Sequence, residues 1–262
     1  MMGRAGRPGF DTNGIAVIMT SNEEKAYYEK ISLNAETVES TLAQVLTEAI
    51  TAEISQSVIT SIDDALIWLK STFFYIRARS KPALYGFPML RDSIQFDGLL
   101  HELCRKTITD LADAMLVKFD EDSHTVEPYP EAHIMTRHMI KFGTMKVLME
   151  LFDQNDIASL LLALSKCTEL QKPLRRDEKS TLNALMKALR FPLKAKVQST
   201  DSKVYVLLQA AVGRLNIIDF SLRVEQSEMV DVVLRILAAL QNLCIERLLG
   251  PLQGKHTLSP FR

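Results

Sequence analysis

The sequence predicts a mainly helical protein with one small β-hairpin. Apolar residues recur at the spacing that places them on one face of a helix, and they do so along most of the 262 residues. Near residue 120, two short extended runs flank an acidic turn. Apolar residues make up 47% of the chain and charged residues 24%, which is ordinary for a globular protein with a sizeable core. A chain of this length suits one large or two small domains.

The first segment combines a glycine-rich start with a short apolar run. Residues 15–19 read Ile-Ala-Val-Ile-Met, a β-branched run that predicts a buried strand. Ser21 then stands three residues before Glu24, which is the spacing of a capping box. This spacing predicts a helix, whose apolar positions include Tyr27, Tyr28 and Ile31.

Three further helices are predicted before residue 113. The first begins near Ala35, and its apolar residues at helical spacing are Val38, Leu42, Val45, Leu46 and Ile50. Ser61 caps the second, which we expect to stop near Ser80 because Pro82 disfavours helical backbone just before it. The third runs from about Phe96 to Ala112.

A β-hairpin follows these helices. Residues 116–119 and 124–127 are extended runs on either side of an acidic turn, residues 120–123. Three helices followed by a small hairpin form the outline of a winged-helix domain. Pro128 and Pro130 then interrupt the chain, so we expect a domain boundary there.

The rest of the chain is almost purely helical. Apolar periodicity predicts helices over residues 134–140, 145–152, 157–164, 178–189, 204–212 and 229–249, and the last of these is long for a globular protein. A methionine-rich stretch fits a helix-packing face and consists of Met135, Met139, Met145 and Met149. Residues 251–262 lack periodicity and predict a frayed tail.

The opening residues Gly-Arg-Ala-Gly-Arg-Pro resemble the last ATPase motif of superfamily 2 helicases, which reads Gln-x-x-Gly-Arg-x-Gly-Arg. The resemblance implies that Arg4 and Arg7 are nucleotide-sensing arginines, which stabilise charge on a transferred phosphoryl group. The glutamine would stand one residue before Met1, so we expect the chain to begin inside a motor domain. The alternative interpretation of these residues is a flexible basic tail.

Nearly the whole chain resembles the C-terminal half of a Ski-two-like helicase with a Sec-sixty-three-type helical domain. The matching stretches include Val38-Glu39-Ser40, Ala52-Glu53-Ile54, Asp64-Ala65-x-x-Trp68-Leu69, Phe74-Tyr75-Ile76-Arg77 and Tyr85-Gly86. Within that family the chain looks most like the helicase-for-meiosis DNA helicases. That closer resemblance depends on Leu174-Arg175-x-x-Glu178-Lys179-x-x-Leu182-Asn183, Arg190-Phe191-Pro192 and Gln209-Ala210-x-x-Gly213.

The resemblance implies a domain organisation and a parent activity. It implies the C-terminal edge of a second RecA-like motor domain over residues 1–20, a winged-helix domain over 21–127, a Sec-sixty-three-type bundle over 128–250 and the tail over 251–262. The implied parent uses ATP and Mg²⁺ to unwind DNA from 3′ to 5′ in meiotic crossover formation, in the nucleus. Its implied partners are single-stranded or branched DNA, the rest of the motor and meiotic recombination proteins.

The chain itself lacks the usual nucleotide-binding sequence, because no Gly-x-x-x-x-Gly-Lys-Ser/Thr loop occurs in it. We therefore expect it to hold no cofactor and to be inactive alone. Two alternatives stay open. One is a fragment of an RNA-remodelling helicase of the splicing type, against which residues 174–183 argue. The other is a non-enzymatic helical interaction module.

Two sets of arginines are candidate nucleic-acid contacts. In the family that the chain resembles, a long helix touches the translocating strand, and the resemblance implies that Arg235 makes that contact. Arg77 and Arg79, with Lys81 nearby, form a basic cluster that a winged helix could place on DNA. The alternative interpretation of both is an ordinary solvated helix position. A looser basic patch is predicted to form salt pairs along a helix and consists of Lys172, Arg175, Arg176, Lys179 and Lys187.

Other classes of site are disfavoured. His101 and Cys104 lie three apart on one predicted helix, but no second pair with metal-ligand spacing accompanies them, so we predict no metal site. The three cysteines, Cys104, Cys167 and Cys244, fit reduced residues rather than a disulfide framework. A formal net charge of -1 means that nucleic acid would have to bind a local basic face. No apolar run is long enough for a membrane span, so no membrane partner is expected.

Overall fold

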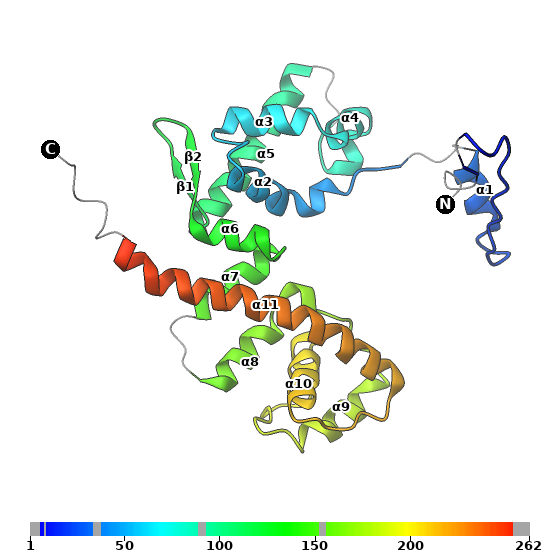
Figure 1. The fold of residues 1–262 in the computed structure, drawn as a ribbon, viewed down its shortest axis with the longest axis vertical. Helices are drawn as coiled ribbons and strands as arrows, with labels where there is room; N and C mark the ends of the chain where they lie inside the picture. Colours follow the sequence, from blue (N-terminus) through cyan, green and yellow to red (C-terminus); the bar gives the residue numbers. More distant parts are fainter. Residues whose placement is uncertain (1–5, 8, 34–37, 89–92, 152–155, 254–262) are drawn as a thin grey trace. The chain divides into compact units, whose positions relative to one another are not determined.

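The computed structural model describes residues 6–7, 9–33, 38–88, 93–151 and 156–253 (Figure 1). The chain divides into two compact units, Met1–Thr41 and Leu42–Arg262, and each is described by itself. The sequence predicted the first domain boundary at residue 20, before the first helix. In the structure the first unit extends to Thr41 and includes that helix.

The first unit contains one helix, α1 (Lys25–Ser32), among its described residues. The predicted strand over residues 15–19 is wrong, because these residues adopt no strand conformation. Their apolar side chains are exposed, with Ile15 at 90%, Val17 at 80% and Met19 at 94%. A strand needs a neighbour for its backbone hydrogen bonds and apolar side chains, and the described part of this unit offers none. The RecA-like edge therefore stays a prediction.

Helix α1 begins one turn later than its predicted cap at Ser21. The Ser21 hydroxyl lies 3.4 Å from the Glu24 backbone nitrogen, a long hydrogen bond. The Glu24 carboxylate accepts from the Thr20 hydroxyl at 2.8 Å. In that arrangement the two side chains do not close a reciprocal capping box, and regular helix starts only at Lys25.

The second unit begins with the helices of the winged-helix domain. They are α2 (Leu46–Ser55), preceded by the 3₁₀ turn η2 (Leu42–Val45), then α3 (Ile62–Lys70), α4 (Phe73–Ser80), the 3₁₀ turn η3 (Pro82–Tyr85) and α5 (Ser93–Asp113). Helix α2 starts later than predicted, since residues 38–41 are not helical. Ser61 caps α3 as predicted, because its hydroxyl accepts from the Asp64 backbone nitrogen at 3.1 Å.

The single helix predicted from Ser61 to Ser80 is two helices, α3 and α4. The break falls at Ser71 and Thr72, whose hydroxyls donate to the carbonyls of Trp68 and Leu69, each at 2.7 Å. Such local side-chain bonds compete with the helical backbone pattern and end the helix.

The hairpin pairs β1 (Val117–Asp120) with β2 (Thr125–Pro128) in antiparallel register, from Val117 opposite Pro128 to Asp120 opposite Thr125. A further bridge joins β2 to Ser61, and the Val126 nitrogen donates to the Thr60 carbonyl at 2.8 Å. Helix α5 packs against α2 and α3. This arrangement confirms the winged-helix outline predicted from the sequence.

The remaining described residues form a helical domain. Its elements are α6 (Pro130–Arg137), α7 (Phe142–Glu150), α8 (Ile157–Ser165), the 3₁₀ turn η5 (Thr168–Leu170), α9 (Glu178–Met186), α10 (Thr200–Val212) and α11 (Phe220–Gln253). Every residue of α10 from Lys203 to Ala210 is buried, and α10 packs against α8, α9 and α11. Helix α11 also contacts α6 and η5, and Figure 1 shows it running past the other helices of this domain.

The observed fold is mainly helical, as predicted. Met135 and Met145 are buried in the core, whereas Met139 is 77% exposed, so the methionine stretch is only partly a packing face. Cys104 and Cys167 are buried and Cys244 is exposed. Within the described ranges, none of the helices combines the length and the apolar character that a membrane span requires.

Candidate nucleic-acid interface

Helix α11 carries the predicted contact residue, Arg235. The helix has 34 residues and is therefore about 50 Å long. Ile236 and Ala239 are fully buried on the side that packs into the domain. Arg235 is partly buried, and its Nε is enclosed but has no hydrogen-bond partner within the described structure. Nε is shielded from solvent, so only the partly exposed remainder of the Arg235 guanidinium can meet an acceptor from outside the described chain.

The neighbourhood of Arg235 includes a polar contact between α6 and α11. The side-chain amide of Asn242 lies 2.8 Å from Nε2 of His138, the residue that follows α6. Burial lowers the pKa of the His138 imidazole, and the positive charges of Arg137 and Arg235 lower this pKa further. His138 is therefore held in its neutral form beside Arg235, and Asn242 lies two helical turns beyond Arg235 on α11.

The start of α11 is held by an ionic cluster, which we define as Arg175, Glu178, Lys203 and Glu225. Lys203 has no exposed side-chain surface, and its Nζ lies 2.8 Å from Glu178 Oε2 and 2.6 Å from Glu225 Oε2. Arg175 pairs with Glu178 and, at 3.1 Å, with Glu225. Burial acts to raise the pKa of the Glu178 carboxyl, but hydrogen bonds from Lys203 and Arg175 outweigh it and the pKa is lowered.

The ionic cluster has further bonds to its surroundings. Lys203 donates to the Pro173 carbonyl at 3.0 Å, and Arg175 donates to the Ser221 hydroxyl at 2.6 Å. Lys172 pairs with Glu228 of α11 at 2.9 Å. Salt pairing was predicted for this basic patch, but Lys172 and Arg175 pair with α11 rather than only along one helix. These two cations are therefore already engaged by carboxylates.

Other polar residues of the sequence motifs also hold the fold together. Gln209 accepts from the Phe191 nitrogen at 3.0 Å and donates to the Phe191 carbonyl at 3.1 Å. Asn183 accepts from the Val197 nitrogen at 3.0 Å, and Gln226 of α11 donates to the Leu207 carbonyl at 3.0 Å. Because they satisfy buried backbone groups, these side chains need no ligand to explain them.

Arg77 and Arg79 lie on α4 in the winged-helix domain. Arg77 is partly buried and Arg79 is exposed. They do not share an element with Arg235, so the predicted contacts belong to two separate places. The tip of the wing carries three exposed acids, Asp120, Glu121 and Asp122, which would repel a phosphate backbone.

Arg4 lies outside the described residues. Arg7 is exposed in a turn, where its backbone nitrogen donates to the Asp11 carboxylate at 2.9 Å. Gly6 and Gly9 have φ angles of +83° and +87°, a backbone conformation that favours glycine. The described part of the glycine-rich segment is therefore a turn, and the roles of Arg4 and Arg7 stay a prediction.

The described residues do not fit a nucleotide–magnesium site, because the chain has no phosphate-binding loop. In the described ranges, no three His, Cys, Asp or Glu side chains are placed to hold a metal ion.

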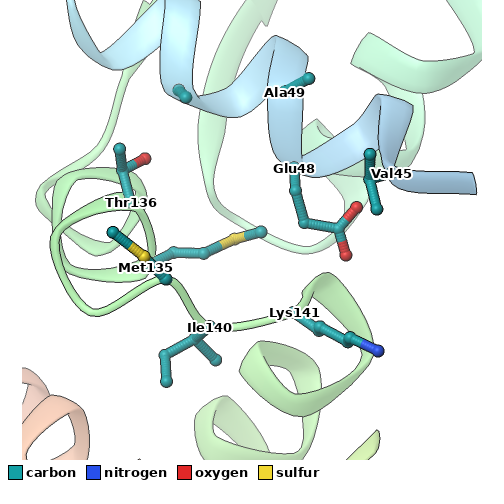
Figure 2. Close-up of a pocket in the computed structure, with 9 residues that line it drawn as sticks. Val45, Glu48, Ala49, Met135, Thr136, Ile140 and Lys141 are labelled. Atoms are coloured by element: carbon teal, nitrogen blue, oxygen red, sulfur yellow. The ribbon is translucent and has the colours of Figure 1, made fainter. Parts of the chain in front are cut away.

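A pocket of 310 Å³ lies between α2 and the α6–α7 connection (Figure 2). Its lining is mostly apolar and comprises Val45, Glu48, Ala49, Ala52, Met135, Thr136, Met139, Ile140 and Lys141. The Glu48 carboxylate accepts from the Phe142 backbone nitrogen at 3.0 Å and so caps the start of α7. The pocket lies between the winged-helix domain and the helical domain, and its one carboxylate, Glu48, is used to hold the start of α7.

Two family models match consecutive parts of the chain. A winged helix-turn-helix domain model of the SNRNP200 type matches residues 39–121, and the Sec63 Brl domain model matches residues 128–253.

Similar proteins match most of the chain. The chain is 37% identical over 235 residues to "Probable ATP-dependent DNA helicase HFM1" of Xenopus tropicalis, covering 87% of this chain and 18% of the relative. It is 32% identical over 219 residues to "ATP-dependent DNA helicase homolog MER3" of Arabidopsis thaliana, covering 79% of this chain and 19% of the relative. It is also 32% identical over 222 residues to "Activating signal cointegrator 1 complex subunit 3" of Bos taurus, covering 82% of this chain and 10% of the relative.

The chain thus spans less than a fifth of the length of these relatives. The order of its elements, a winged helix followed by a helical domain, agrees with the two family models. The chain therefore carries a winged helix-turn-helix domain of the SNRNP200 type followed by a Sec63 Brl domain, and over most of its length it is similar to proteins named as the HFM1 and MER3 DNA helicases.

Proposed function

We propose that this chain is an accessory part of a DNA helicase and holds single-stranded DNA through Arg235 of α11. The observation that carries the proposal is a partly exposed arginine without an acidic partner among the described residues, Arg235, in the middle of the longest helix of the described chain. The partly exposed end of the guanidinium could donate to a phosphate oxygen, and a base could stack on the guanidinium plane. Neither contact depends on the base sequence of the DNA, which suits a helicase because the strand moves past the contact.

The names of the relatives support the wider setting of this proposal. HFM1 and MER3 are named as ATP-dependent DNA helicases. By analogy, the whole protein would couple ATP hydrolysis with Mg²⁺ to 3′–5′ unwinding in meiotic recombination in the nucleus. The motor and meiotic recombination proteins would be its partners. Arg4 and Arg7 would sense the nucleotide in that larger protein.

The test is a titration of fluorescently labelled single-stranded DNA with the full chain. Arg235→Ala should weaken binding by about 1–3 kcal/mol, the range for loss of one stacking contact. Arg223→Ala is the matched control, because Arg223 is an exposed arginine on the same helix whose guanidinium lies over the Phe220 ring. It should bind as the wild type does.

Salt dependence separates this contact from general attraction. We expect weak binding at 50 mM salt that falls steeply at 200 mM, since the net charge of -1 leaves only local cations to release counterions. Wild-type affinity in Arg235→Ala, together with loss of binding in an Arg77→Ala/Arg79→Ala variant, would assign the contact to the winged helix instead.

An RNA substrate is the second candidate. The sequence argument against it depended on residues 174–183, but Arg175, Glu178 and Asn183 are engaged in structural contacts. Those contacts show how these residues hold the fold, and they leave the argument from resemblance as it stands. Titration with an RNA oligonucleotide of the same base sequence decides between DNA and RNA, and tighter binding of RNA would favour the remodelling function.

A protein-interaction module is the third candidate, favoured by the acidic wing tip, Asp120, Glu121 and Asp122. On this hypothesis neither nucleic acid binds measurably to the full chain at 50 mM salt.

A further inference from the structure

Helix α11 is fixed on both sides of Arg235 by contacts that do not involve Arg235. Before it, Glu225 joins the ionic cluster and Gln226 donates to the Leu207 carbonyl. After it, Asn242 contacts His138. Glu225 precedes Arg235 by ten residues and Asn242 follows it by seven, which places them about 15 Å and about 10 Å away along the helix axis.

The ionic cluster joins segments that are far apart in sequence. Arg175 lies just before α9, and Glu178 is the first residue of α9. Lys203 lies on the buried face of α10, and Glu225 lies in the second turn of α11. Its two positive and two negative side chains balance one another. Because removing two charges from water is costly, such a cluster is weak evidence for stability, but it does require one specific arrangement of its members.

A helix transmits rotation along its length, because its backbone hydrogen bonds keep successive residues at a fixed angle. The Glu225 contacts are therefore among those that fix the direction of Arg235, together with the Gln226 hydrogen bond and the buried Ile236. The unbonded Arg235 side chain has no hydrogen bond of its own at Nε that would correct its direction.

We propose that the ionic cluster positions Arg235 for its nucleic-acid contact by setting the rotation of α11. Arg175, Glu178, Lys203 and Glu225 are then positioning residues, and this inference rests on the proposed function of Arg235. Lys203 and Glu178 are inaccessible, with 0% and 1% of their side-chain surface exposed, so they act through α11 and not by touching the strand.

The test variant is Lys203→Met/Glu225→Gln. It removes one positive and one negative charge, so the net charge of the chain and its long-range attraction for DNA stay unchanged. The Arg175–Glu178 pair remains as a balanced pair. Thermal unfolding followed by circular dichroism confirms that the variant is folded before binding is measured.

Binding is compared in a cycle of four proteins: wild type, Lys203→Met/Glu225→Gln, Arg235→Ala, and the combination. We expect the cluster variant to lose about fivefold or more of the affinity for a labelled single strand. In the Arg235→Ala background the same change should cost less than about twofold, because residues that act through one another are not additive.

Each outcome has one meaning. Wild-type affinity in the cluster variant, with a loss in Arg235→Ala, overturns the positioning role and leaves the proposed function intact. Equal losses in both backgrounds also overturn it, since the cluster would then act independently of Arg235. Wild-type affinity in Arg235→Ala overturns the proposed function itself, and the positioning role with it.

A milder variant covers the case in which the first does not fold. Glu225→Asp keeps the charge but shortens the side chain by one methylene group, which lengthens its contacts with Lys203 and Arg175. It should lose a few-fold in affinity in the wild-type background and nothing further in Arg235→Ala. A folded Glu225→Asp variant could instead bind with wild-type affinity and show unchanged hydrogen exchange in the first turns of α11. That result would mean that binding does not depend on the exact geometry of the ionic cluster, and it would contradict the proposal.

Discussion

At the scale of single residues, Arg235 and His138 form an electrostatically coupled pair beside the α6–α11 contact. The positive charge of Arg235 helps to lower the pKa of His138, although burial is the larger cause. The neutral imidazole can accept a hydrogen bond from the Asn242 amide, whereas the imidazolium cannot accept one at a protonated Nε2. The protonation state of His138 therefore affects how α11 is held.

A pH dependence of stability follows. The folded pKa of His138 lies below its unfolded value of about 6.5, so the unfolded chain binds more protons as the pH falls through that value. The stabilising effect of the neutral imidazole is present above about pH 6.5 and is lost as the pH falls toward the folded pKa. Urea unfolding at pH 7.5 and at pH 5 should show a larger loss in the wild type than in His138→Gln.

The comparison with His138→Gln removes the contributions of the other titrating groups, which are common to both proteins. Parallel pH profiles for the two proteins would show that His138 does not contribute.

At the scale of elements, α9, α10 and α11 depend on buried polar side chains as well as on apolar packing. Lys203 stands within the fully buried run of α10 and would be an unpaired charge without Glu178 and Glu225. Its presence there is tolerated because its ammonium group donates hydrogen bonds to Glu178 and to the Pro173 carbonyl and is ion-paired with Glu225. Helix packing and charge pairing in this domain are therefore mutually dependent.

Breaking one partner of the cluster should cost more stability than removing a balanced pair. Lys203→Met leaves two carboxylates with only Arg175, and we expect a loss of about 3–5 kcal/mol in the free energy of unfolding. Lys203→Met/Glu225→Gln should lose less. Chemical denaturation of both variants measures this, and an equal or larger loss in the double variant would show that charge balance is not what matters.

At the scale of the whole molecule, the chain contains a winged-helix domain and a Sec63 Brl domain but no sequence for binding nucleotide phosphates. Phosphoryl transfer requires a phosphate cradle and a metal ligand to position the nucleotide. Arg4 and Arg7 alone cannot take the place of the phosphate cradle and the metal ligand.

We therefore expect no nucleic-acid-stimulated ATP hydrolysis by this chain alone. Phosphate release is measured with and without single-stranded DNA, and the rates should equal the background. Turnover above background that disappears in Arg4→Ala would contradict this prediction and would place a nucleotide site on this chain.

Local patterns in the sequence determined most of the elements. The helical periodicity, the acidic turn between extended runs and the Ser61 cap predicted the helices, the hairpin and a helix start that the structure contains. Such signals concern residues a few positions apart, which is the range over which backbone geometry and capping act. Helix ends were less well predicted, as the break at Ser71 and Thr72 shows, because local hydroxyl bonds there compete with periodicity.

Only the tertiary structure decided how the charged residues are used. The sequence places Arg175 three residues from Glu178, but its contacts with Ser221 and Glu225 bring together residues 46 and 50 positions apart. Such partners depend on which faces of the helices pack, which no local pattern contains. For the same reason, the apolar residues 15–19 predicted a strand, although whether they form one depends on neighbouring strands that the described unit does not provide.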